Sequence, residues 1–203
     1  LHVTFAKSER TKKRIIETVA PIFNKKGYQS TALSDITSAT GLTKGAIYGN
    51  FGNKENLAEA CFNHNVKFLQ KGLQITWAAN PSNIGKLIGL LNFYHQNFET
   101  VANNGGCPLM NVAVEADDFY PFFKEKAKTI LLNWQSEITS VIKEGQNSGE
   151  IKPEIDAANF ANFYIATIEG GILIAKTAND PASFFNIIEN LKSLVNHQLK
   201  ITT

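Results

Sequence analysis

Residues 27–57 constrain the fold of this chain more than any other segment, because they place two short helical patterns around a single glycine. Gly41 stands where a sharp corner between helices needs a left-handed backbone, which glycine adopts without a steric penalty. Thr43 follows as a suitable N-cap for a short helix over 44–50. This arrangement predicts a helix-turn-helix, the motif that lays its second helix in the major groove of DNA. The apolar residues expected to hold its helices together are Ile36, Ala39, Leu42 and Ile47.

The predicted second helix combines very small residues with polar side chains that can reach DNA. Gly45, Ala46 and Gly49 allow its backbone to approach a partner closely. Lys44 can reach a guanine or a phosphate, and backbone N–H groups beside Lys54 at the next helix start also favour phosphate. The alternative is a helix corner in an unrelated helical protein. The residues that we predict to contact DNA are Thr43, Lys44, Gly45, Tyr48, Asn50 and Lys54.

A longer run in this segment, GLTKGAIYGNFGNKENL over 41–57, contains a Tyr-x-x-Phe element followed by Lys-Glu-x-Leu. Phe23, Gly27 and Tyr28 precede it at the end of the first predicted helix. Together these residues resemble the DNA-binding signature of the TetR/AcrR repressors. Asn50 departs from the family pattern, which commonly has His there, so the resemblance does not supply an operator sequence.

The resemblance implies a ligand-responsive repressor that binds a palindromic operator as a homodimer. It implies a DNA-binding head over residues 1–53 and a ligand-binding and dimerisation body over residues 54–203. A rival interpretation is a helical small-molecule-binding or catalytic protein in which the helix-turn-helix is vestigial. The basic head and the lack of an acid–base constellation argue against that rival, so we expect no enzyme activity.

Charge is distributed unevenly along the chain, although the whole sequence of 203 residues carries only +2. Residues 1–60 contain nine Lys or Arg and five Asp or Glu, a net charge of +4, which leaves −2 for the rest. A basic excess beside a helix-turn-helix is the electrostatic pattern that phosphate binding needs. Ordinary scatter explains such an excess equally well where no motif accompanies it.

Helical periodicity extends over almost the whole chain, and no segment alternates as a strand does. The pattern predicts an all-α fold with a three-helix head and a six-helix body, the fourth helix joining the two without a flexible linker. We expect Ser8, Thr31 and Asn53 to cap the first, second and fourth helices. The predicted helices cover 8–26, 31–40, 44–50, 54–78, 84–102, 109–115, 119–147, 156–178 and 181–199.

The predicted body is dense in aromatic residues, which can line an apolar cavity or belong to an ordinary core, and core packing is favoured for any one of them. The resemblance implies that the body as a whole binds a small effector. Asn111, Glu115 and Glu169 occur in apolar stretches and can point inward, where an unpaired carboxylate would need a partner or a ligand. We expect an apolar or aromatic effector whose binding moves the fourth helix, with Trp77 and Trp134 reporting it. The predicted ligand-binding residues are Phe68, Phe98, Met110, Asn111, Trp134, Tyr164 and Glu169.

The last two predicted helices carry small residues among large apolar ones, which favours close helix packing between two subunits. Burial within one subunit is the alternative. The resemblance implies the dimeric arrangement, and we expect Gly171→Arg to open it. The predicted interface residues are Phe160, Tyr164, Gly171, Phe184, Ile188 and Leu191.

Other functional classes have weaker support in the sequence. Cys107 follows a Gly-Gly pair that can expose a thiol for redox sensing, but a small buried residue at a helix start is the favoured interpretation. The acidic cluster of Glu115, Asp117 and Asp118 has no His companion and suggests a solvated helix end. We therefore predict no metal site and no cofactor. No apolar run matches a bilayer span or a secretion signal, so we expect no membrane partner and a cytoplasmic location.

Overall fold

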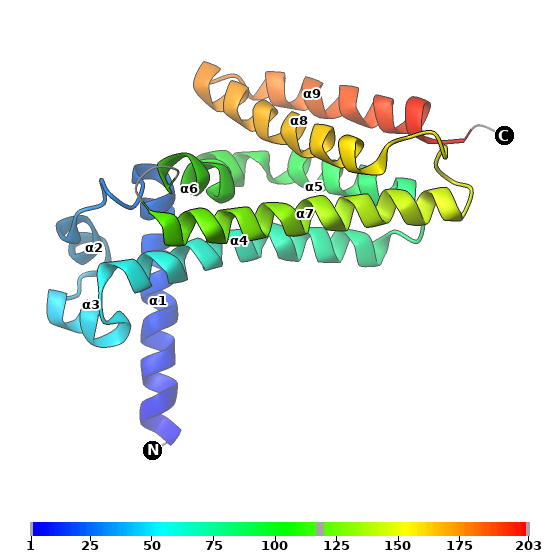
Figure 1. The fold of residues 1–203 in the computed structure, drawn as a ribbon. Helices are drawn as coiled ribbons and strands as arrows, with labels where there is room; N and C mark the ends of the chain where they lie inside the picture. The colour runs from blue at the N-terminus through cyan, green and yellow to red at the C-terminus, as the bar shows by residue number, and fades with distance from the viewer. Residues whose placement is uncertain (1, 117–119, 202–203) are drawn as a thin grey trace. The chain divides into compact units, whose positions relative to one another are not determined.

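The computed structural model describes residues 2–116 and 120–201 of the 203-residue chain, with side chains from Ser8 onward. The described residues form nine α-helices and one π-helical turn, which confirms the predicted all-α fold (Figure 1). None of these helices is both long and apolar enough to cross a membrane. The helices are α1 (His2–Lys26), α2 (Leu33–Thr40), α3 (Lys44–Phe51), α4 (Lys54–Ala79), α5 (Asn83–Asn103), α6 (Pro108–Ala116), α7 (Pro121–Asn147), α8 (Ala157–Ala178) and α9 (Pro181–Leu194), followed by the π-helical turn η1 (Val195–Leu199).

Local capping explains where most of these helices begin and end. The Thr43 hydroxyl accepts the Ala46 amide at the start of α3, and the Asn53 side chain accepts the Asn56 amide in the first turn of α4. Gly41 ends α2 with a φ of 68°, a left-handed backbone that a side chain would strain. These three sequence predictions are confirmed.

Three predicted helix limits are wrong, each for a local reason. Thr31 does not cap α2, because its hydroxyl donates to the Gly27 carbonyl while the Asp35 carboxylate accepts the Ala32 amide. Helix α1 begins at His2 rather than Ser8, since nothing in the intervening sequence breaks a helix. The last α-helix ends at Leu194, and the expected continuation over 195–199 is the π-helical turn.

The chain divides into two compact units. We call residues 1–69 with 108–124 the head unit and residues 70–107 with 125–203 the body unit. Helix α6, which the sequence assigns to the body, therefore belongs to the head unit. The boundary expected after residue 53 divides the chain by function and stays a prediction. Helix α4 is one helix across the residue at which the units divide, and a rigid connection between head and body stays a prediction.

The core of the head unit is an apolar cluster to which every helix of this unit contributes. An ion pair between Lys26 and Asp35 at 2.7 Å and a hydrogen bond from Arg14 to the Thr40 carbonyl at 3.3 Å attach α2 to α1. These contacts fix the helix-turn-helix to the long helix α1. The buried residues of the cluster are Ile15, Val19, Ala20, Phe23, Ile36, Ile47, Leu57, Ala58, Cys61, Ala116 and Phe123.

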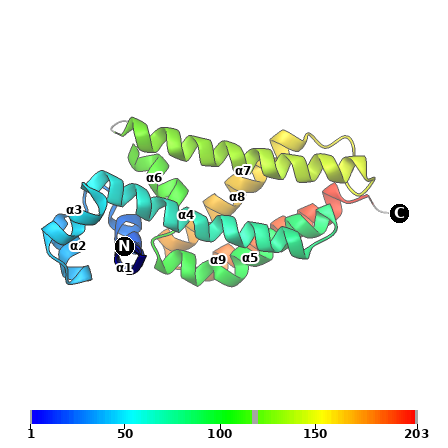
Figure 2. The ribbon, with the colours of Figure 1, turned by 90° about the horizontal axis from the view of Figure 1, so that it is seen from below.

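In the body unit, α8 and α9 form an antiparallel pair, and α9 also packs along α5 (Figures 1 and 2). The Tyr164 hydroxyl donates to the Leu87 carbonyl at 2.6 Å, which satisfies a polar group in the middle of this core. Its largest fully buried side chains are Leu87, Leu91, Ile142, Ile151, Tyr164, Phe184, Ile188 and Leu199.

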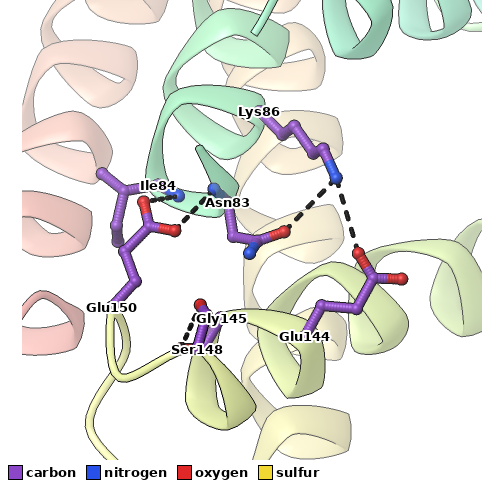
Figure 3. A network of polar contacts seen from close by, with 7 residues as sticks. All are labelled: Asn83, Ile84, Lys86, Glu144, Gly145, Ser148 and Glu150. Atoms are coloured by element: carbon purple, nitrogen blue, oxygen red, sulfur yellow. Dashed lines mark hydrogen bonds and ion pairs between the residues drawn. The ribbon is translucent and has the colours of Figure 1, made fainter. Parts of the chain in front are cut away.

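A polar network fixes the start of α5 to the end of α7 (Figure 3). The two carboxylate oxygens of Glu150 accept the Asn83 and Ile84 amides at 2.7 and 2.8 Å, which caps the free N–H groups of α5. Burial favours a higher pKa for Glu150, but these amide hydrogen bonds outweigh it and lower the pKa. Lys86 adds contacts to Asn83 and Glu144. The network therefore holds the body unit together at the end of α7.

Candidate DNA-binding and effector sites

Helix α3 has one anchored face and one exposed face. Ile47 is fully buried, and Tyr48 and Phe51 pack partly buried against the same apolar cluster of the head unit. On the other side Thr43, Lys44, Gly45 and Gly49 are exposed. The predicted recognition helix is thus anchored on one face, and of its predicted DNA-contacting residues Thr43, Lys44 and Gly45 are exposed, whereas Tyr48 and Asn50 are half-buried. Ala39 differs from expectation, because the structure leaves it exposed beside the turn.

The two glycines of α3 leave open space on this exposed face. A Cβ atom built on Gly49 would meet nothing within 4 Å, and one built on Gly45 would meet only the Thr43 hydroxyl at 3.9 Å. Neither glycine has the positive φ that excludes other residues, so the fold itself does not demand glycine here. A bare strip of helix backbone is suited to close approach by a large partner.

The polar side chains of α3 are already oriented by contacts within the helix. The Lys44 ammonium lies 5.8 Å from the centre of the Tyr48 ring, within cation–π range. The Asn50 amide donates to the Ala46 carbonyl at 2.8 Å, which leaves its other N–H and its oxygen for a partner. The three side chains thus offer a charge, a phenol and an amide from one short helix.

Lys54 lies at the first turn of α4, as predicted, but its ammonium is engaged inside the head unit. It sits 4.5 Å from the centre of the Tyr28 ring. Burial lowers the pKa of Lys54, and the nearby Glu115 carboxylate opposes that shift. A phosphate bound at this helix start would therefore compete with the aromatic ring for the lysine.

Glu115 is a structural residue of the head unit, so of the two positions that the sequence allowed for it, the inward one with a partner fits better than a solvated helix end. Its two carboxylate oxygens accept the backbone amides of Tyr28 and Gln29 at 2.7 and 2.8 Å. A Cβ on Gly27 would lie 2.8 Å from the same carboxylate, so glycine is required there for a close approach as well as for its φ of 81°. Asp117 and Asp118 of the predicted cluster lie outside the described residues.

The predicted ligand-binding residues are divided between the two units. In the head unit, Phe68 is 43% exposed and Met110 is half-buried. The Asn111 amide donates to the carbonyl and side chain of Asn24 at 3.0 and 3.2 Å, so it ties α6 to α1. These contacts give Asn111 a structural role that its position in the sequence did not reveal.

The remaining predicted ligand-binding residues lie in the core of the body unit. Phe98 stacks on Phe184 with ring centres 4.5 Å apart, and Tyr164 bonds Leu87 as described above. Trp134 is buried with an indole nitrogen that has no hydrogen-bond partner within the described part of the chain, and the same holds for Glu169 Oε2. Buried polar atoms of this kind are uncommon and call for an explanation.

Both cysteines are buried, and neither forms a disulfide. Burial raises the pKa of Cys61 to about 12, which keeps this thiol protonated at neutral pH. Cys107 is 2% exposed, and its thiol hydrogen-bonds the Glu169 carboxylate. The structure thus favours the buried small residue over an exposed thiol sensor. Among the described residues, no three His, Cys, Asp or Glu side chains gather where they could hold a metal ion.

Five of the six predicted interface residues are already buried inside one chain: Tyr164, Gly171, Phe184, Ile188 and Leu191. A Cβ on Gly171 would lie 3.1 Å from the Phe184 ring, so Gly171→Arg would disturb the α8–α9 packing within a subunit and cannot test dimerisation cleanly. Phe160 is partly exposed. The open apolar surface of α8 instead consists of Phe163, Leu173 and Ile174, beside Gly170.

Two family models match successive segments of this chain. Residues 15–61 match the family model described as bacterial regulatory proteins, tetR family, and residues 84–191 match the tetracyclin repressor-like C-terminal domain. A curated relative, the HTH-type transcriptional repressor DhaR of Mycobacterium sp. strain GP1, is 26% identical over 81% of this chain and 82% of its own length.

Solved structures agree in fold over nearly the entire chain. A TetR transcriptional regulator from Chloroflexus aurantiacus J-10-fl is 31% identical, with a TM-score of 0.91 over 97% of this chain and 100% of that one. A TetR-family regulator from Cytophaga hutchinsonii is 35% identical, with a TM-score of 0.85 over 97% and 98% of the two chains. Both the head unit and the body unit of this chain therefore have counterparts in these two structures.

Proposed function

This chain belongs to the TetR family of transcriptional regulators, and we propose that it represses transcription by binding a palindromic operator as a homodimer. A small effector, bound in the body, releases it from DNA. The observation that carries the DNA-binding part is the exposed strip of α3, on which Gly45 and Gly49 leave open space beside Lys44. Such a surface lets a helix backbone come close to base edges while its lysine contacts a phosphate or a guanine.

The test of DNA binding uses DNA from the region upstream of the gene for this protein and measures affinity at several salt concentrations. Lys44→Ala and Lys54→Ala should each weaken binding and lower the salt slope by about one unit per lost phosphate contact. Lys143→Ala, an exposed lysine of the body unit, is the matched control. Unchanged affinity and slope in both head variants would show that α3 does not lie at the DNA.

The effector part of the proposal concerns the aromatic body unit and the continuous helix α4. An effector releases DNA only if it binds the non-DNA-binding arrangement more tightly, and such coupling is typically about 1–3 kcal/mol. Helix α4 begins at Lys54 and carries Trp77 near its other end, so a shift of this helix is the proposed lever. The indole nitrogens of Trp77 and Trp134 are both buried and have no hydrogen-bond partner among the residues that the structure describes.

Tryptophan emission therefore provides a direct test of effector binding. Hydrophobic and aromatic compounds are screened for a change in emission and for operator release in the same samples. A compound that changes emission and lowers operator affinity supports the lever. A compound that changes emission while operator affinity stays constant argues for a pocket without coupling to DNA.

A further inference from the structure

The Glu169 carboxylate in the body unit has an oxygen that the described part of the chain leaves without a hydrogen bond. Oε2 is buried and has no partner, although Glu169 as a residue is half-buried. Leaving a buried acceptor unsatisfied destabilises the folded protein, and more so when the group is charged. Such a group in a natural protein calls for an explanation, and in the proposed effector-binding unit a ligand contact supplies one.

The groups around Glu169 define what this oxygen can accept. Tyr94 of α5, Tyr164 of α8 and Cys107 in the preceding loop form one electrostatic cluster with it. The Cys107 thiol bonds the carboxylate, which favours its charged, accepting form. Tyr164 is committed to the Leu87 carbonyl. The cluster therefore supplies two aromatic rings and a weak donor to a buried acidic group.

Burial raises the pKa of Glu169 to about 7, and the hydrogen bond from Cys107 partly opposes this shift. Among the described residues, no basic side chain contributes to the shift. Lys176 lies two helical turns further along α8, but its ammonium donates to the Gly105 carbonyl in the loop before α6. Among the described residues, none is therefore identified that brings a positive charge to this carboxylate. A ligand that brings this charge would complete the site.

We infer that Glu169 is the polar anchor of the effector site and that the effector is an aromatic or apolar molecule bearing a protonated amine. This inference rests on the proposed effector-binding function of the body unit. An ammonium group donates a charge-assisted hydrogen bond to Oε2 and is attracted by aromatic faces such as those of Tyr94 and Tyr164. A carboxylate ligand would instead repel Glu169, and an alcohol would leave its charge unbalanced.

The test compares ligands that share a ring and differ in the charged group. Benzylamine, 1-naphthylmethylamine and 4-biphenylmethylamine are each matched with the corresponding alcohol and carboxylate. Binding is measured by calorimetry and by thermal shift on the wild-type chain, on Glu169→Gln and on Glu154→Gln, an exposed control in the same unit. At least one amine should bind about tenfold or more tightly than its alcohol and carboxylate partners, and Glu169→Gln should remove that advantage.

A second measurement uses the wild-type protein alone and does not depend on the folding of a variant. The bound amine should gain about tenfold in affinity between pH 6 and pH 8, because Glu169 becomes ionised over this interval while the amine stays protonated. Tyr94 and Tyr164 do not ionise there, since burial raises the pKa of both well above the usual 10.

Three outcomes would overturn the inference: no amine binds, the alcohols or carboxylates bind best, or the amines keep their affinity in Glu169→Gln. Operator release is recorded separately with the same amines. Binding that depends on Glu169 but leaves operator affinity unchanged would support this site and contradict the proposed effector control. Failure of the wild-type protein to bind DNA would contradict the proposed repressor function and leave the ligand measurements unaffected.

Discussion

At the scale of single residues, two glutamates of this fold lie in opposite surroundings. Both oxygens of Glu115 accept backbone amides, whereas Glu169 shares one weak thiol bond and has one oxygen with no partner in the described part of the chain. The first arrangement stabilises a fold, and the second destabilises the charged form of the side chain. A single residue type thus supports structure in the head unit and a proposed binding site in the body unit.

The raised pKa of Glu169 predicts how stability depends on pH. Its pKa rises from 4.5 to about 7 on folding, so the folded state binds the extra proton between these values. The stabilisation is fully present below about pH 4.5 and is lost as the pH rises through 7, by at most about 3 kcal/mol. Urea unfolding at pH 5 and pH 8 should show Glu169→Gln gaining stability relative to the wild type at the higher pH.

The matched control for this prediction is Glu154→Gln, the same substitution at an exposed position of the body unit. A difference between Glu169→Gln and the wild type that is the same at both pH values would mean that the Glu169 carboxylate is solvated in the folded protein.

Capping and turn interactions were predictable where both partners lie within a few positions of one another in the sequence. Thr43, Asn53 and Gly41 fill cap and turn positions that the sequence order alone defines. Glu115 bonds residues 86 and 87 positions away, and no periodicity in one sequence relates those segments. The cap assigned to Thr31 failed because two nearby side chains compete for the same turn and Asp35 makes the capping bond.

At the scale of helices, α3 is built so that stability and DNA binding respond differently to a substitution. Gly49→Leu adds a side chain into open space and replaces a poor helix former, so the free energy of unfolding should stay constant or rise by up to about 1 kcal/mol. The added side chain should hold the backbone away from DNA and weaken operator binding by about tenfold or more. Circular dichroism melts and gel shifts on the same sample measure both effects.

Ser136→Leu adds the same side chain at an exposed position of α7 and should leave operator binding unchanged. Full operator affinity in Gly49→Leu would place the close contact with DNA elsewhere on the head unit.

Helix α6 connects chain segments that belong to different compact units. Cys107, just before it, belongs to the body unit and bonds Glu169, whereas Glu115 near its end bonds the head unit segment after α1. Glu115→Ala removes two charge-assisted bonds and should lower the free energy of unfolding by about 1–2 kcal/mol, because the amides it leaves are partly accessible to water. Chemical denaturation measures this loss.

Glu99→Ala, an exposed position on α5, provides the comparison for loss of a glutamate without loss of such bonds. Wild-type stability in Glu115→Ala would show that the α1–α2 segment holds its conformation without α6.

Helix count and order were predictable from sequence because a 3.6-residue apolar period and Pro, Gly and Asn breaks recur along the chain. The side of each helix that faces its own subunit was harder to assign. Both faces of α8 are apolar, so the sequence selected Tyr164 for an interface, whereas the structure buries it against α5. Likewise, periodicity cannot show that α6 packs with the head unit.

At the scale of the whole molecule, reading a palindrome requires two heads, and one chain supplies a single helix-turn-helix. The apolar side chains exposed on α8 offer a surface for a second copy. Phe163, Gly170 and Ile174 follow the spacing of seven and four that places residues on one helix face. Phe163 and Ile174 are 47% and 52% exposed. Exposing these apolar side chains to water is unfavourable, and burial between two subunits would remove that exposure.

Gly170→Arg tests this surface without disturbing the subunit, because a Cβ at Gly170 meets nothing within 4 Å. A charged side chain in the centre of an apolar interface should convert the dimer to a monomer at micromolar concentration, and operator affinity should fall with it. Sedimentation velocity and gel shifts measure the two effects. Leu132→Arg, on an exposed apolar residue of α7, should leave the dimer intact. A dimeric Gly170→Arg variant would place the interface elsewhere, and a monomeric wild type with full operator affinity would contradict the two-head model itself.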